Sequence, residues 1–260
     1  MPLPKALLCI LDDDPSDPPH EELRLRSVGF AAATASWREV AAVRGGWMQL
    51  LPILDDPAVQ AWVFRGRSGD FTTDVLRRWG MLVLALTRPR PPIMACLLTD
   101  DGPEPHLPDF MGDVRVFRAH DPSFAARLMA LRPKIGPLPP LPFHAAAHLD
   151  PLIGQWLEVG PGEGVIWQGF MAGVTHAEVT AFGVGPRGGL PRKCTLQHAL
   201  RGIEGNWGGN PFSACAARNV LEADTACFLR VEGEPGAVFV TPYPEENGED
   251  SLPVAYLEFA

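Results

Sequence analysis

The sequence has little positive charge and no run of lysine and arginine. Its 260 residues include 22 lysines and arginines against 31 aspartates and glutamates, which gives a formal net charge of −9. Nucleic acids are bound by clustered cations, and no basic stretch interleaved with aromatic residues is present to follow a phosphate backbone. The sequence therefore predicts no nucleic-acid partner.

Long apolar runs are also missing. The first apolar stretch, Ala6 to Leu11, ends at Asp12 and has only the length of one strand. It is too short for the apolar core of a secretory signal and far too short to span a bilayer. We therefore predict a cytoplasmic protein without a membrane partner.

Paired cysteines are lacking as well. The five cysteines are an odd number and show no CxxC spacing, and several lie in apolar runs. Such thiols pack as small apolar groups, so the sequence does not predict a disulfide framework.

The first 132 residues alternate short β-like runs with segments of helical spacing, a pattern that predicts a doubly wound parallel α/β sheet. The predicted strands are Lys5 to Leu11, Val28 to Thr34, Val59 to Arg65, Ile93 to Thr99 and Val114 to Arg118. The predicted helices are Glu21 to Arg26, Trp37 to Leu54, Phe71 to Leu86 and Ser123 to Leu131. Gly45 and Gly46 interrupt the second helix, where we expect a kink or break.

A proline-rich segment divides the chain. The stretch RPKIGPLPPLPF, from Arg132 to Phe143, holds five prolines, which exclude a continuous helix or a central strand. We predict a receiver-like domain over residues 1–132, a linker over 133–143 and a smaller α+β domain of unassigned role over 144–260. In that second domain, glycine-rich turns separate apolar stretches, and a short helix is predicted from Thr195 to Ile203.

The N-terminal half resembles a response-regulator receiver domain. The segments that carry the likeness are LDDDP (Leu11 to Pro15), VGFAAATAS (Val28 to Ser36) and ACLLTDDG (Ala95 to Gly102). In that family an acidic pair, matched here by Asp12 and Asp13, binds Mg²⁺, and a hydroxyl, matched by Thr99, contacts the phosphoryl group. Aspartates also favour solvated turns, so an acidic loop without metal is the competing interpretation of Asp12 and Asp13.

The resemblance stops at the phosphoacceptor. The family places an aspartate at the end of the third strand, where this sequence has Phe64, Arg65 or Gly66, and Asp70 comes several residues too late. The family's lysine after the fifth strand is matched by Arg118, whose planar fork differs from an ammonium group. We therefore predict a degenerate receiver site at which Arg65 forms an ion pair with the acidic residues and no phosphotransfer takes place.

The same half is similar to the receiver-like N-terminal wing of bacterial ornithine, lysine and arginine decarboxylases. The segments are DDPAVQAWVF (Asp55 to Phe64), RPPIMACLLTDD (Arg90 to Asp101) and LPDFMGDVRVF (Leu107 to Phe117). Residues 210–249 are more weakly similar to that family's last domain, with Tyr243, Pro244 and Gly248 matching loosely. The pyridoxal-phosphate domain between these parts is missing, and Lys134 and Lys193 lack the Ser-x-His-Lys setting of a Schiff base, so no cofactor is expected.

Two pairs of residues in the second half have the spacing of catalytic or metal sites. His144 and His148 lie four apart, which on a helix places both imidazoles on one face, and His176 or Cys194 is a candidate third metal ligand. The glutamate of an HExxH motif is absent. Cys194 and His198 are also four apart and match a thiolate and its base, but a half-buried helix is the favoured interpretation of this spacing.

A Toll/interleukin-receptor-type NADase is a further alternative, because such domains share the flavodoxin-like layout. These enzymes need a glutamate on the helix that follows the third strand. The corresponding segment, Asp70 to Arg88, contains Asp70 and Asp74 but no glutamate.

These observations favour a non-catalytic regulatory or assembly protein built on a pseudo-receiver domain. Its expected partner is another protein or a second copy of the chain, because the segment Phe71 to Leu86 is more apolar than a single buried stripe requires. The predicted interface residues are Phe71, Val75, Trp79, Leu82 and Leu86. The alternatives are the NADase and an enzyme with its site in the C-terminal domain, either a metal-dependent hydrolase or a remnant of a pyridoxal-phosphate decarboxylase.

Overall fold

The computed structural model of the chain describes residues 3–12, 20–88, 91–134, 136–244 and 255–260. The chain divides into two compact units, residues 1–139 and 140–260. The division falls inside the proline-rich segment. No helix among the described residues is long and apolar enough to cross a membrane.

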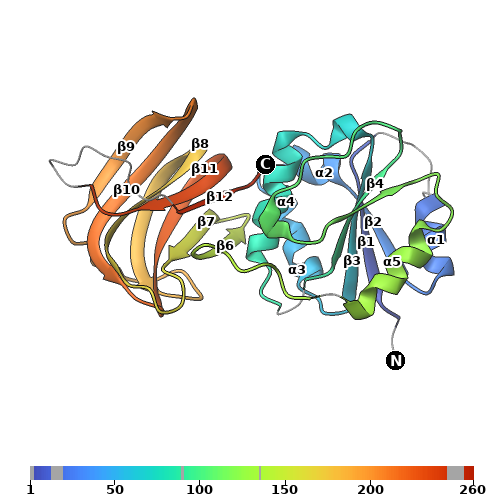
Figure 1. Cartoon of the computed structure of the whole chain (residues 1–260), viewed down its shortest axis with the longest axis horizontal. Coiled ribbons are helices and arrows are strands. Elements are labelled where there is room, and N and C mark those ends of the chain that lie inside the picture. Colours follow the sequence, from blue (N-terminus) through green and yellow to red (C-terminus); the bar gives the residue numbers. More distant parts are fainter. Residues whose placement is uncertain (1–2, 13–19, 89–90, 135, 245–254) are drawn as a thin grey trace. The chain divides into compact units, whose positions relative to one another are not determined.

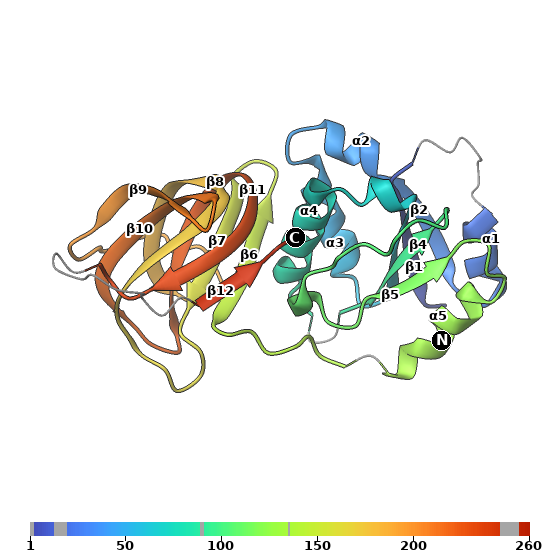
Figure 2. The same ribbon diagram turned by 45° about the horizontal axis from the view of Figure 1, so that its top comes forward.

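The described part of the first unit contains a five-stranded parallel sheet with the strand order β2-β1-β3-β4-β5 (Figures 1 and 2). Its strands are β1 (Lys5–Ile10), β2 (Ala31–Ser36), β3 (Val59–Gly66), β4 (Ile93–Leu98) and β5 (Arg115–Arg118). This order is that of flavodoxin-like doubly wound folds. The predicted α/β fold is confirmed, and only β2 begins noticeably later than expected.

The helices of this unit lie on both faces of the sheet (Figure 1). They are α1 (His20–Ser27), α2 (Trp37–Ala42), α3 (Leu51–Leu54), α4 (Thr73–Ala85) and α5 (Phe124–Leu131), with short 3-10 turns η1 (Gly46–Leu50), η2 (Ser68–Asp70), η3 (Asp109–Met111) and η4 (Arg132–Lys134). Gly45 adopts the left-handed region with φ of 69°, and a Cβ on Gly46 would lie 2.3 Å from the carbonyl oxygen of Val40. The predicted break in the second helical segment is therefore confirmed, and it separates α2 from η1 and α3.

Successive side chains of each strand point to opposite faces of the parallel sheet, so the core of this unit has two parts. Leu8 and Val63 point to the face on which Leu25 of α1 and Leu128 of α5 pack. The intervening residues, Trp62 and Phe64 among them, form an aromatic cluster with Trp37 of α2 and Trp79 of α4, in which the rings of Trp62 and Trp79 meet edge to face at 5.5 Å. Both faces of the sheet are thus covered, as the near-continuous apolar strands require.

The second unit is an antiparallel sheet with the order β6-β7-β11-β8-β10-β9, and β12 also pairs with β11 (Figure 2). Its strands are β6 (His144–Asp150), β7 (Gly154–Gly160), β8 (Trp167–Pro186), β9 (Leu200–Trp207), β10 (Asn210–Leu221), β11 (Thr225–Thr241) and β12 (Ala255–Glu258). The described residues of this unit contain no helix, so the helical part of the α+β prediction is wrong. Residues 195–199 form a loop, and Leu200 begins β9.

Candidate functional site

A buried arginine lies at the carboxyl edge of the parallel sheet. Arg65, the penultimate residue of β3, has a side chain that is only 6% exposed, and its guanidinium forms ion pairs with Asp12 and Glu21. The pair with Asp12 is a direct hydrogen bond from Nη1, while Nε of Arg65 is 3.6 Å from Oε2 of Glu21. A buried cation needs such partners to offset its loss of hydration.

The fold explains why these three residues meet. The strands are parallel, so Asp12, just after β1, and Arg65, at the end of β3, emerge at the same edge, and the backbone N–H of Leu11 donates to the carbonyl of Arg65 at 2.8 Å. Glu21 comes from the first turn of α1, in which two acidic residues are buried. The second of these, Glu22, accepts a hydrogen bond from Thr34 of β2 at 2.6 Å and pairs with Arg26.

The other receiver-like positions follow the same edge. Thr99 comes directly after β4, and its hydroxyl is buried without a hydrogen-bond partner among the described residues. Arg118, at the end of β5, donates to the carbonyl oxygens of Asp100 and Gly102 at 2.8 and 2.9 Å and so holds the loop after β4. Asp70 caps a local turn by accepting from the N–H of Arg67. Asp13 lies outside the described residues.

The positive charge of Arg65 decides what chemistry this edge of the sheet can support. The end of β3 offers a guanidinium where a phosphoacceptor site would need a carboxylate, and Asp12 forms an ion pair with that cation. A divalent metal beside Arg65 would meet the repulsion of a like charge. The arrangement therefore suits a fixed ion pair rather than a phosphorylation site.

A second buried cluster lies in the antiparallel sheet. Glu158 of β7 is 1% exposed, and its two carboxylate oxygens lie 2.8 Å from Nε2 of His144 and 2.7 Å from Nε2 of His148. Both histidines are on β6, where alternate residues share a face, and Glu158 pairs with Ala146 between them. A carboxylate only accepts hydrogen bonds, so each imidazole carries its proton on Nε2. The two histidines thus share a strand face, and the prediction that a helix places them together is wrong.

The carboxylate of Glu158 also binds the chain that follows β8. The backbone N–H of Gly188 lies 3.1 and 3.2 Å from the two oxygens. Burial alone would raise the pKa of Glu158, but the hydrogen bonds from His144, His148 and Gly188 outweigh burial and lower the pKa to about 2. Glu158 is therefore ionised at neutral pH, and its carboxylate joins the edge strand β6 to the loop after β8.

The remaining candidate ligands do not join this cluster. His176 bonds Asn210 at 3.0 Å, and Cys194 is an exposed thiol in the loop between β8 and β9. Asp150 accepts from the backbone of Leu152 in the β6–β7 turn. Across the described residues, no three histidine, cysteine, aspartate or glutamate side chains form a group that could hold a metal ion.

The predicted interface residues lie on or beside α4. Trp79 and Leu82 are fully buried, Phe71 and Val75 are nearly so, and Leu86 is half-buried. The apolar excess of this segment is therefore already covered within the chain, and a partner surface here stays a prediction.

Glu158 is the residue that the sequence patterns did not mark. The available signal is period-two alternation in β7, where Trp156, Glu158 and Gly160 share one face with the two histidines of β6. Comparisons with protein-family models, with curated proteins and with solved structures found no match to the chain.

Proposed function

We propose that this protein is a non-catalytic regulatory or assembly protein whose first domain is a pseudo-receiver that works without phosphorylation. The observation that carries the proposal is the buried ion pair of Arg65 with Asp12 at the carboxyl edge of β3. In a doubly wound sheet this edge, between β1 and β3, is the position where ligands bind. Here the protein's own guanidinium occupies it.

An internal ion pair at this position has a regulatory consequence. A phosphorylation-dependent switch changes the charge of its edge and thereby moves neighbouring loops. Arg65 stands where such a switch would carry the carboxylate that is modified, so phosphorylation does not change the charge at this edge. The domain is then held in one state and binds its partner, another protein or a second copy of the chain, constitutively.

Acetyl phosphate with Mg²⁺ tests this proposal on the full chain. We expect no phosphoryl adduct by intact-mass spectrometry and no change of solution mass by light scattering when the two reagents are added. A phosphoaspartate, or a change of solution mass that requires Mg²⁺ and acetyl phosphate, would contradict the proposal. A known receiver domain treated in parallel shows that the phosphodonor is active.

A further inference from the structure

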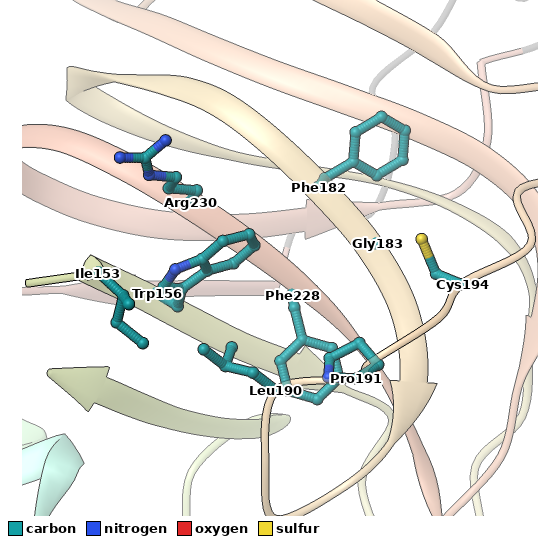
Figure 3. Close-up of a pocket in the computed structure, with 9 residues that line it drawn as sticks. All are labelled: Ile153, Trp156, Phe182, Gly183, Leu190, Pro191, Cys194, Phe228 and Arg230. Carbon is teal, nitrogen blue, oxygen red and sulfur yellow. The ribbon is translucent and has the colours of Figure 1, made fainter. Parts of the chain in front are cut away.

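The antiparallel sheet has an apolar pocket of about 470 Å³ (Figure 3). Trp156, which lines it, lies two residues before Glu158 in β7, so the two side chains share one face of the sheet. Trp156 of β7, Phe228 of β11 and Gly183 of β8 form the floor of the pocket, and Leu190, Pro191 and Cys194 approach from the loop that follows β8. The size lies within the range of roughly 300–1,000 Å³ that small-molecule sites occupy.

Two glycines allow the loop to lie close to the sheet. A Cβ on Gly183 would lie 3.1 Å from Sγ of Cys194, and one on Gly185 would lie 2.5 Å from Cβ of Pro191. Side chains at either position would push the loop away from β8. The two glycines therefore allow the loop, which forms the roof of the pocket, to pack closely against β8.

The loop is fixed at both ends and has no regular structure between them. At its start, Gly188 donates to Glu158, and Arg187 donates to the carbonyl oxygens of Thr225 and Pro161. At its end, the backbone carbonyl of Gln197 accepts from the backbone N–H of Arg218 at 2.8 Å, and the backbone carbonyl of His198 accepts from the hydroxyl of Tyr243 at 3.0 Å. The loop therefore forms a fixed roof over the pocket. The hydrogen bond from Gly188 to Glu158 helps to hold the start of this loop.

One charged side chain lines this apolar space. Arg230 of β11 lies beside Trp156 on one side of the pocket, with Cys194 on the opposite side (Figure 3). Arg230 is 43% exposed, and its ion-pair partner Glu232 is 3.9 Å away, too far for a hydrogen bond. Its guanidinium can therefore present parallel N–H donors to an anion at the pocket mouth.

The geometry points to a binding site for a small planar aromatic molecule that carries one anionic group, a carboxylate or sulfonate. Trp156 and Phe228 supply ring faces and edges for an aromatic body, and Arg230 supplies the complement to its charge. An exposed apolar rim supports this assignment, because Leu152 is 94% exposed and its neighbour Ile153 lines the pocket. This site is independent of the receiver-like edge.

Two fluorescent probes of similar shape test the site on the full chain. Anilinonaphthalene sulfonate carries an anionic group, and N-phenylnaphthylamine is neutral. We expect saturable one-to-one binding of both, and Arg230→Met should weaken binding of the sulfonate by at least about tenfold, because hydrogen bonds to a charged group are lost. Binding of the neutral amine should not change.

Arg192→Met is the matched control, because Arg192 is exposed on the same loop and does not line the pocket. It removes the same charge, so it should leave both affinities unchanged. Cys194 gives a second readout: iodoacetamide should alkylate it several-fold more slowly when the sulfonate is bound. Equal losses in both variants, binding that leaves alkylation of Cys194 unchanged, or no saturable binding of either probe would each overturn the assignment.

Discussion

Each domain has a buried cluster of polar side chains around one charged group, and the two central groups have opposite charges. In the parallel sheet a cation, Arg65, is surrounded by the carboxylates of Asp12 and Glu21. In the antiparallel sheet a carboxylate, Glu158, is surrounded by two imidazoles and a backbone N–H. The first cluster closes the edge where a doubly wound fold binds ligands, whereas the second anchors the roof of a pocket and leaves that pocket accessible.

The largest expected effect comes from reversing the charge in the first cluster. Arg65→Asp gathers three acidic groups at one buried edge, and breaking a buried ion pair in this way should lower the free energy of unfolding by about 4 kcal/mol. Mg²⁺ should restore part of the loss, because the variant has the acidic set that a divalent cation prefers. Calorimetry of the full chain with and without Mg²⁺ measures both effects.

Arg44→Asp is the control for this charge reversal, because Arg44 is an exposed residue of the same domain. It should change stability by less than about 0.5 kcal/mol. If Arg65→Asp melts like the wild type with and without Mg²⁺, the ion pair is not buried as described.

Neutralising Glu158 at the centre of the second cluster should lower the free energy of unfolding by a smaller amount. Glu158→Gln keeps the shape but leaves one imidazole N–H facing an amide N–H₂, so we expect a loss of about 2 kcal/mol. Backbone amides of β6 and of residues near Gly188 should exchange hydrogen faster, because both are joined to β7 through this carboxylate. Exchange confined to other strands would show that Glu158 does not hold the edge strand or the loop.

Glu163→Gln is the matched control, since Glu163 is exposed in the loop between β7 and β8. Stability and amide exchange should stay at wild-type values in this variant.

Acid provides a milder way to perturb the second cluster. The folded-state pKa of Glu158 is about 2, below its ordinary value of 4.5, so its stabilising contribution is complete above pH 4.5 and is lost as the pH falls toward 2. Denaturant unfolding at a series of pH values should show a steeper decline below pH 4.5 in the wild type than in Glu158→Gln; parallel curves would contradict the depressed pKa.

The first cluster was predictable from sequence because parallel strands end at one edge. Once β1 and β3 were identified by their apolar runs, Asp12 and Arg65 had to lie close together. The contribution of Glu21 was not predictable, because it depends on where α1 begins after a segment that carries no regular apolar pattern. Sequence spacing alone also does not show that the apolar residues of α4 are buried within the chain.

Only the two histidines of the second cluster could be identified from the sequence. His144 and His148 were marked by their spacing, but an interval of four residues places side chains on one face of a helix and also of a strand. The alanines between them favour a helix by propensity, and pairing with β7 overrides that preference. Glu158 itself lies in a strand that no motif marks. The roof of the pocket depends on a long loop, for which sequence offers no periodic signal.

The smallest expected effect concerns cysteine reactivity, which also differs between the domains. Both cysteines of the first domain, Cys9 and Cys96, are buried, and burial raises the pKa of Cys9 to about 12. The thiolate is the reactive form, so these residues should resist alkylation in the folded protein. In the second domain Cys194 is exposed, whereas Cys215 and Cys227 are buried.

Iodoacetamide under native conditions should therefore add one group, and peptide mapping should place it on Cys194. Cys194→Ser should abolish the labelling and change stability by less than about 0.5 kcal/mol, because an exposed side chain loses little packing. Rapid labelling of Cys9 or Cys96 in the native protein would mean that the parallel sheet opens more readily than its buried core indicates.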